Sequence, residues 1–165
     1  MSSKGNTSLA EGIPHIKDAF VVIIKTEWNA NIVDELESGC RSVLENHQVA
    51  FEVITVPGAF EIPFAVRAYC RSRRRMPSAF IALGAVIKGD TPHFDYVCKA
   101  VTEGVVALNL LLEVPVIFGV LTVNNEEQAR QRMGGNQGHK GEEAAITAIK
   151  MIDLGEQFVH KKRKK

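Results

Sequence analysis

Apolar residues along this chain fall into short, β-branched runs that alternate with longer segments of helical spacing. The runs predict strands at 19–25, 51–56, 79–87 and 115–123. The helical spacing predicts a first helix directly after a cap at Asn29 or Asn31. It predicts further helices at about 60–72, 93–113, 125–133 and 140–158. Strands and helices in this alternation are typical of a parallel sheet covered by helices on both faces. We therefore expect a three-layer α/β/α domain with a four-stranded parallel sheet.

Open parallel sheets bind their ligands beyond the carboxyl ends of the strands. In this chain the segments at those ends are 26–29, 57–61, 86–93 and the stretch after Phe118. Functional residues are therefore expected in these four segments.

The helix at 93–113 is apolar on more than one side. One stripe consists of Phe94, Val97, Val101, Val105, Leu108 and Leu112. A second, partial region consists of Ala100, Val106, Leu110 and Leu111. The sheet of one four-stranded domain can cover only the first stripe, and a helix with two apolar faces is usually covered on both. The second region therefore predicts contact with another copy of the chain, that is, a homo-oligomer.

The length of 165 residues fits one domain, and 45% hydrophobic with 24% charged residues is typical of a globular fold. We expect a flexible segment at 1–18, the domain itself at 19–158 and a basic tail at 159–165. Five of the 20 basic residues are the last five positions, which leaves 15 basic against 19 acidic residues elsewhere. This mildly acidic body argues against nucleic acid as a partner. A basic run of this kind is more often a solvated end than a contact for phosphate backbones or acidic lipid.

The three cysteines are Cys40, Cys70 and Cys98, and no two of them have the spacing of metal ligands. Each lies in a predicted helix, where a buried, reduced thiol is the ordinary state. Reduced thiols suit a cytoplasmic protein, and we expect that location and no metal site. No apolar run reaches the roughly 18 residues that a membrane span needs, so we expect no contact with a membrane.

The loop at 88–93, with the sequence KGDTPH, joins a strand end to a helix start. Free amides and the positive end of the helix dipole favour an anion there, although an ordinary capped loop is the alternative. His93 is the last residue of this segment and lies on the first turn of the helix. An imidazole titrates near neutral pH, which suits proton transfer, and a plain surface histidine is the alternative.

Three further residues are candidates for substrate contacts. Arg132 ends the short helix at 125–133 and can hold a phosphate through two donors at once. Lys140 opens the last helix after a glycine-rich link at 134–138. Trp28 is the single tryptophan, and its flat ring can stack on a heterocycle at the end of the first strand. For Arg132 and Lys140 the alternative is an ordinary surface charge. For Trp28 the alternative is a place in the core or at an interface.

Several longer motifs occur together in this chain. They are, in chain order, VPGAFEIP at 56–63, GAVIKGDTPHFDY at 84–96, FGVLT at 118–122, EQA at 127–129, Arg132, and KG at 140–141 before an alanine-rich helix. In order and spacing these motifs resemble the lumazine synthase family over 19–158. So many long motifs in one chain make the resemblance highly specific.

The resemblance implies a flavodoxin-like sheet and one condensation reaction. Its substrates are 5-amino-6-(D-ribitylamino)uracil and 3,4-dihydroxy-2-butanone 4-phosphate, and its products are 6,7-dimethyl-8-ribityllumazine, phosphate and water. This is the penultimate step of riboflavin biosynthesis, and it needs no cofactor and no metal. The family also implies a pentamer or a shell of 60 subunits, with riboflavin synthase as a candidate partner. The short glycine-rich link at 134–138 favours the shell.

The resemblance further implies a role for each matching residue. On the pyrimidine side, Trp28 stacks on the ring, Ala59, Phe60 and Glu61 line the ribityl pocket, and the backbone of Val86 and Ile87 meets the uracil edge. On the phosphate side, Asp90, Thr91 and Arg132 hold the phosphate, His93 carries the proton, and Phe118 and Lys140 come from the adjacent subunit.

Three residues depart from the family pattern. Asn136 stands where many relatives carry lysine, His139 replaces an asparagine, and Trp28 replaces the more common phenylalanine. Asn136 and His139 are expected to make the phosphate loop less positive. Two rival functions stay open on the sequence: a non-catalytic relative that binds flavin or lumazine, and a different flavodoxin-like transferase that binds phosphate.

Overall fold

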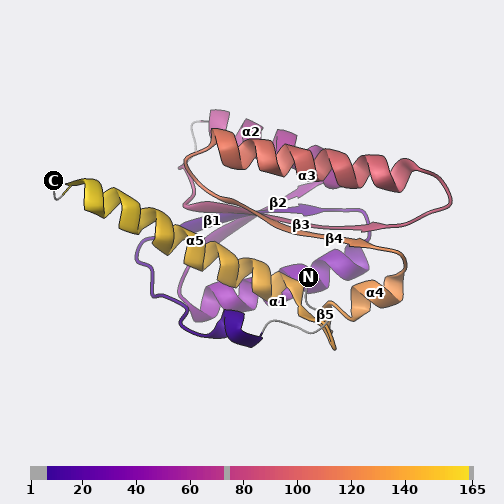
Figure 1. The fold of residues 1–165 in the computed structure, drawn as a ribbon, viewed down its shortest axis with the longest axis horizontal. Helices are drawn as coiled ribbons and strands as arrows, with labels where there is room; N and C mark the ends of the chain where they lie inside the picture. The colour runs from indigo at the N-terminus through magenta and orange to yellow at the C-terminus, as the bar shows by residue number, and fades with distance from the viewer. Residues whose placement is uncertain (1–6, 73–74, 164–165) are drawn as a thin grey trace.

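A computed structural model describes residues 7–72 and 75–163, and its centre is one parallel sheet (Figure 1). The strands are β1 (Phe20–Thr26), β2 (Ala50–Val56), β3 (Ala79–Ile87) and β4 (Val116–Val123), and they lie in the order β2-β1-β3-β4. All three neighbouring pairs are parallel. The four predicted strands are confirmed to within one residue at each end, because their apolar runs are buried between two helical layers.

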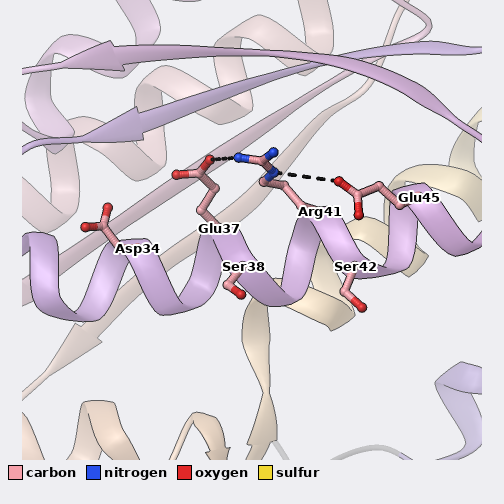
Figure 2. A pocket seen from close by; sticks show the side chains of 6 residues that line it. All are labelled: Asp34, Glu37, Ser38, Arg41, Ser42 and Glu45. Carbon is pink, nitrogen blue, oxygen red and sulfur yellow. Dashed lines mark hydrogen bonds and ion pairs between the residues drawn. The ribbon is translucent and has the colours of Figure 1, made fainter.

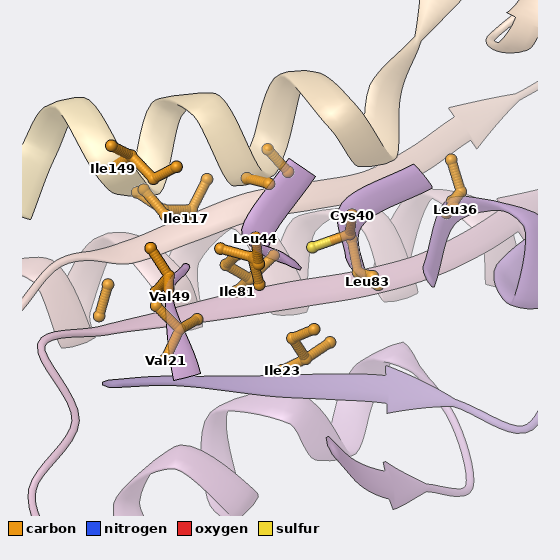
Figure 3. Close-up of a cluster of buried hydrophobic side chains, with 14 of the residues drawn as sticks. Val21, Ile23, Leu36, Cys40, Leu44, Val49, Ile81, Leu83, Ile117 and Ile149 are labelled. Carbon is orange, nitrogen blue, oxygen red and sulfur yellow. The ribbon is translucent and has the colours of Figure 1, made fainter. Parts of the chain in front are cut away.

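Two helices cover each face of the sheet (Figure 1). On one face lie α1 (Ala30–Asn46) and α5 (Lys140–Arg163), and on the other lie α2 (Ile62–Arg71) and α3 (His93–Leu111). The side chains of β1 alternate between the two cores. Val21 and Ile23 pack with α1 and α5, in the core that Figure 3 shows, and Val22 and Ile24 pack with α2 and α3. This confirms the predicted three-layer α/β/α architecture.

The shorter elements are η1 (Thr7–Ala10), η2 (Ala59–Glu61), α4 (Glu126–Arg130), β5 (Met133–Gly135) and β6 (Gly138–His139). The helix predicted at 125–133 ends three residues early, at Arg130, so the prediction was wrong for residues 131–133. From Met133 the chain forms an antiparallel hairpin instead. Gly134 and Gly138 have φ angles of 108° and 77°, a backbone conformation that favours glycine and allows the tight turn.

The last helix is longer than the sequence predicts. It continues past the predicted end at 158 as far as Arg163, and its final turns run beyond the edge of the sheet (Figure 1). Residues 164–165 of the predicted tail and 1–6 of the predicted flexible segment lie outside the described residues. Among the described residues, no helix combines the length and the apolar character that crossing a bilayer requires.

The two apolar regions of α3 have different surroundings. Val101, Val105 and Leu108 of the first stripe are buried against the sheet and α2. Leu110 of the second region is 82% exposed, and Val106 and Leu111 are exposed as well. Within one chain, therefore, the second region is open to solvent over the last two turns of the helix, where the sequence predicts contact with another copy.

Candidate active site

The carboxyl ends of β1, β2 and β3 bring three predicted substrate segments together. Thr26 pairs with Val56 across β1 and β2, so Trp28 and η2 follow neighbouring strand ends. The backbone N–H of Trp28 donates to the Pro57 carbonyl at 3.2 Å. On the other side of β1, the side-chain amide of Asn29 donates to the Ala85 carbonyl at 2.8 Å. Residues far apart in the sequence thus form one edge.

Large aromatic side chains project from this edge. Trp28 is 74% exposed and Phe60 is exposed as well, whereas Ala59 is buried. Val86 and Ile87 at the end of β3 are partly exposed, and on the side of β1 the ladder of β3 ends at Leu83, before these two residues. Exposed aromatic side chains grouped beside accessible backbone are typical of a binding surface for a flat molecule.

Glu61 extends the same edge with a negative charge. Its side chain is exposed, and its backbone N–H donates to the Gly58 carbonyl at 3.2 Å. A Cβ atom added at Gly58 would lie 3.0 Å from the Glu61 carboxylate. Gly58 therefore leaves the room that this carboxylate occupies, and the carboxylate is available to accept hydrogen bonds from hydroxyl groups.

The loop at 88–92 leads from β3 into α3. The Lys88 N–H donates to the Val123 carbonyl at 2.9 Å, which fixes the start of the loop against the end of β4. α3 begins at His93 and its N-cap is Pro92, which provides no side-chain cap. A Cβ atom at Gly89 would meet nothing within 4 Å. The amino end of α3, where the sequence predicts an anion, is thus without a side-chain cap.

His93 is exposed at the first position of α3. Within residues 7–72 and 75–163, its imidazole has no hydrogen-bond partner. A ring in this position can exchange protons with a substrate that binds at the loop. Asp90 and Thr91 are exposed in the same loop, next to it in the chain.

Arg132 and Lys140 are held side by side by the hairpin that the sequence did not predict. The Lys140 N–H donates to the Arg132 carbonyl at 2.8 Å. The Arg132 guanidinium donates to the Gln128 carbonyl at 2.8 Å, and the Lys140 ammonium lies 2.7 Å from both carboxylate oxygens of Glu143. In the described chain, no hydrogen bond or ion pair joins either cation to His93 or to the loop at 88–92.

Phe118 lies apart from this edge. It pairs with Ala82 in the first half of β4, whereas the last residue of β4, Val123, pairs with Ile87. Five residues of strand, roughly 16 Å, therefore separate Phe118 from the carboxyl end of β4. Its side chain is 41% exposed on an edge strand. One subunit does not bring Phe118 to Trp28 and His93.

A hollow of about 400 Å³ lies alongside α1 (Figure 2). Its one basic side chain is paired with acidic neighbours: Arg41 lies 3.3 Å from Glu37 and 3.9 Å from Glu45. Lys25 lies 2.8 Å from Asp34, and the hydrogen bonds to Asp34 and then Glu37 raise the pKa of the lysine. The hollow lacks aromatic side chains, and none of the predicted substrate residues lines it.

The three cysteines lie in helices, as predicted, and all are free thiols. Cys40 is buried, and this burial raises the pKa of its thiol to about 12. A thiol with such a pKa stays protonated and is a poor nucleophile at neutral pH. Cys70 and Cys98 are half-buried.

Known proteins of one kind match nearly the whole chain. A family model described as 6,7-dimethyl-8-ribityllumazine synthase matches residues 18–156. The 6,7-dimethyl-8-ribityllumazine synthase of Bacteroides fragilis is 50% identical over 135 residues, which cover 80% of this chain and 93% of the relative. The enzyme of the same name from Parabacteroides distasonis is 44% identical over 145 residues, which cover 86% of this chain and 89% of the relative. That from Bdellovibrio bacteriovorus is 46% identical over 139 residues, with 84% and 76% covered.

These matches agree with the motifs and with the sheet. The chain belongs to the 6,7-dimethyl-8-ribityllumazine synthase family, and it is a transferase of riboflavin biosynthesis that condenses 5-amino-6-(D-ribitylamino)uracil with 3,4-dihydroxy-2-butanone 4-phosphate to 6,7-dimethyl-8-ribityllumazine.

Proposed function

We propose that each active site is completed by two subunits. One subunit supplies the carboxyl edge of the sheet with Trp28 and His93, and the next supplies Phe118 and Lys140. The observation that carries this proposal is the separation of these groups within one chain: Phe118 lies in the first half of β4, and Lys140 is bound to Glu143 rather than to the loop at 88–92.

Arg132 belongs with Phe118 and Lys140, the residues that the next subunit supplies. The resemblance alone left Arg132 on the subunit that carries His93. The backbone bond from Lys140 to Arg132 spans 2.8 Å and joins the two residues across the hairpin. Because this bond holds the two residues together at the base of the hairpin, just outside β5 and β6, we propose that Arg132 and Lys140 reach the phosphate from the same subunit.

The pyrimidine substrate binds along the exposed edge. Trp28 stacks on its ring, the backbone of Val86 and Ile87 bonds the uracil edge, and the ribityl chain lies over η2. Ala59 and Phe60 form the floor and wall of that pocket, and Glu61 accepts hydrogen bonds from the ribityl hydroxyls. The exposure of the aromatic side chains and of the Glu61 carboxylate supports this arrangement.

The sugar phosphate binds at the amino end of α3. Backbone amides of Asp90 and Thr91, together with the Thr91 hydroxyl, hold its phosphate, and the positive end of the helix dipole favours the anion. Arg132 and Lys140 add positive charge from the neighbouring subunit. His93, at the first position of α3, then lies beside the reacting carbons and carries protons between them.

The chemistry follows from this placement. The amine of the pyrimidine attacks the ketone, and loss of water gives a Schiff base. Loss of a proton and of phosphate then leaves an enol, which tautomerises to a new ketone. The second amine of the pyrimidine attacks this ketone and closes the ring with loss of a second water. Each step moves a proton to or from a substrate atom, which is the task of His93. The phosphate ligands hold the leaving group as its charge develops.

We propose that the assembly is a homo-oligomer built from pentamers, either alone or as a shell of 60 subunits, with riboflavin synthase as a candidate partner. The exposed second region of α3, with Leu110 at its centre, supports contact between copies. The hairpin at 133–139 is short, which suits the shell. The three free thiols support a cytoplasmic location.

Replacing Arg132 by alanine tests the phosphate site. The KM for the sugar phosphate is expected to rise about tenfold or more, since a charge-assisted hydrogen bond contributes about 1.5–3 kcal/mol. The KM for the pyrimidine should change little. Steady-state kinetics, followed by lumazine fluorescence, measure both values.

Arg130→Ala is the matched control for this experiment. Arg130 lies in α4, two residues from Arg132, and pairs with Glu126 at 3.0 Å on the exposed surface. Its loss should leave both KM values unchanged, because exposed pairs contribute little. An unchanged KM for the sugar phosphate in Arg132→Ala would contradict the assigned role.

A further inference from the structure

The backbone between β1 and α1 changes direction at Asn29, directly after the stacking residue Trp28. Asn29 has φ 58° and ψ 43°, the left-handed conformation. Its carbonyl accepts the N–H groups of Ile32 at 2.9 Å and Val33 at 3.0 Å, so the residue opens α1 through its backbone. Asparagine is one of the few residues with a side chain that adopts this conformation readily.

The side chain of Asn29 does not cap the helix that it opens. The sequence predicts a cap at Asn29 or Asn31, and Asn29 occupies the N-cap position, but it makes no side-chain cap hydrogen bond. Its amide reaches across to β3 instead and donates to the Ala85 carbonyl at 2.8 Å. The contact joins residues 56 positions apart in the sequence.

This bond continues the junction between β1 and β3 beyond the end of their ladder. The last paired residues of the two strands are Lys25 and Leu83. Two residues further along β3 stands Ala85, the neighbour of the Val86 and Ile87 backbone that meets the uracil edge in the proposed function. The Asn29 amide is therefore a tie between the Trp28 segment and the uracil-binding segment.

Other bonds fix the opposite side of Trp28. Its N–H donates to the Pro57 carbonyl at 3.2 Å, and its carbonyl accepts from the hydroxyl of Thr26 at 3.2 Å. Thr26 itself is 2% exposed and sits in the core beneath the site. The bond to Pro57 sets where the Trp28 backbone lies relative to β2, the bond from Thr26 holds it to the end of β1, and the Asn29 amide sets where it lies relative to β3.

We propose that Asn29 is a positioning residue for the condensation, which holds the Trp28 indole at a fixed separation from the 86–87 backbone and so shapes the slot for the pyrimidine ring. This inference rests on the stacking role of Trp28 in the proposed function. A flat ring gains its stacking contact and its edge hydrogen bonds together only if the two walls keep their spacing. Asn29 acts through the bond from its amide to the Ala85 carbonyl.

Two substitutions remove the tie in different ways. Asn29→Gly keeps the left-handed backbone without strain and deletes the side chain. Asn29→Asp keeps the shape of the side chain, but its carboxylate cannot donate to the Ala85 carbonyl. Each variant is expected to raise the KM for the pyrimidine about three- to tenfold, which is the range for one neutral hydrogen bond. The KM for the sugar phosphate should stay at its wild-type value.

Fluorescence gives an independent reading of the same slot, because Trp28 is the only tryptophan of the chain. Titration with the pyrimidine substrate alone should quench the emission of the wild-type assembly. In both Asn29 variants the midpoint of quenching should shift to about three- to tenfold higher concentration. Gln48→Gly is the matched control, since Gln48 has the same φ of 58° but lies in the turn between α1 and β2.

The outcomes separate this inference from the proposed function. Normal quenching in the wild type, with an unchanged midpoint and KM in both Asn29 variants, overturns the role of Asn29 alone. An equal rise in both KM values, or a lower melting temperature with unchanged KM, makes Asn29 a general structural residue and also overturns it. No quenching in the wild type, with a wild-type KM in Trp28→Ala, refutes the stacking role and the inference with it.

Discussion

Replacing His93 by alanine is expected to slow the condensation by tens-fold to hundreds-fold and to leave measurable turnover. The imidazole is exposed at the first position of α3, beside the loop that receives the phosphate in the proposed function. Removal of the imidazole deletes its contribution to proton transfer. The two substrates, an amine and an activated ketone, react without a nucleophile from the protein.

The residual activity has a physical source. Holding two reactants in a productive orientation lowers a barrier by about 7–11 kcal/mol, and that effect comes from the walls of the site rather than from His93. The variant therefore keeps the positioning contribution, and its KM values should stay close to those of the wild type. Stopped-flow or steady-state measurements of lumazine formation give kcat and both KM values.

His15→Ala is the control for this prediction. His15 is exposed like His93, but it precedes β1 and lies at the opposite end of the strands from the carboxyl edge. Its loss should leave kcat unchanged. If His93→Ala folds and assembles but shows no turnover at all, the division of work between positioning and proton transfer is wrong.

Replacing Gly141 by alanine is expected to destabilise the fold by about 3 kcal/mol or more, at the upper end of the range for overpacked cores. Gly141 is buried in the first turn of α5, where the helix crosses α1. An added Cβ atom would overlap the carbonyl oxygen of Leu36 and lie 2.7 Å from its carbonyl carbon and 2.9 Å from its Cα atom. All of these atoms are backbone, so no side chain can rotate away.

Gly155→Ala gives a direct contrast within the same helix. A Cβ atom at Gly155 would meet nothing within 4 Å. Alanine there should raise stability by up to about 1 kcal/mol, because glycine is a poor helix former. Thermal unfolding at equal protein concentration should lower the midpoint of Gly141→Ala by roughly 6–12 °C and leave that of Gly155→Ala unchanged or higher. Equal midpoints for the two variants would show that α1 and α5 do not approach as closely as described.

The four strands and the three layers follow from the sequence because their signals are local. The apolar run of β1 needs burial on both faces, and Val21 to Ile24 are completely buried. The position of Pro63 in the first turn of α2 was also predictable, since proline fits only there in a helix. The exposed face around Leu110 was predicted from its place off the main stripe of α3.

The hairpin after α4 was not predictable from the same signals. Its strands of three and two residues are too short for an alternating pattern, and glycines occupy most of them. The segment therefore resembles a plain linker. Only the structure brings Arg132 beside Lys140 and places the ring of His139 against Gly39 of α1.

The candidate site was predictable as a list of residues but not as an arrangement. The carboxyl edge follows from the order of the elements, and the family match removes both the rival transferase and the non-catalytic relative. The tie between Asn29 and Ala85 spans 56 residues and leaves no local pattern. The predicted strand at 115–123 already placed Phe118 in its first half. The expectation that the stretch after Phe118 lies at the carboxyl end was wrong, because β4 continues to Val123, which pairs with Ile87.

Mixed assemblies test most directly whether two subunits share each active site. His93→Ala and Arg132→Ala chains, carrying different tags, are produced together, and particles that contain both are purified and sized by sedimentation. Activity is measured at a sugar phosphate concentration far below the raised KM of Arg132→Ala. If each site takes His93 from one subunit and Arg132 from the next, about a quarter of the sites in an equal mixture carry both wild-type groups. Activity near that fraction of the wild type is expected. Activity equal to the mean of the two parent variants would contradict active sites shared between subunits, and so would a chain that sediments as a monomer.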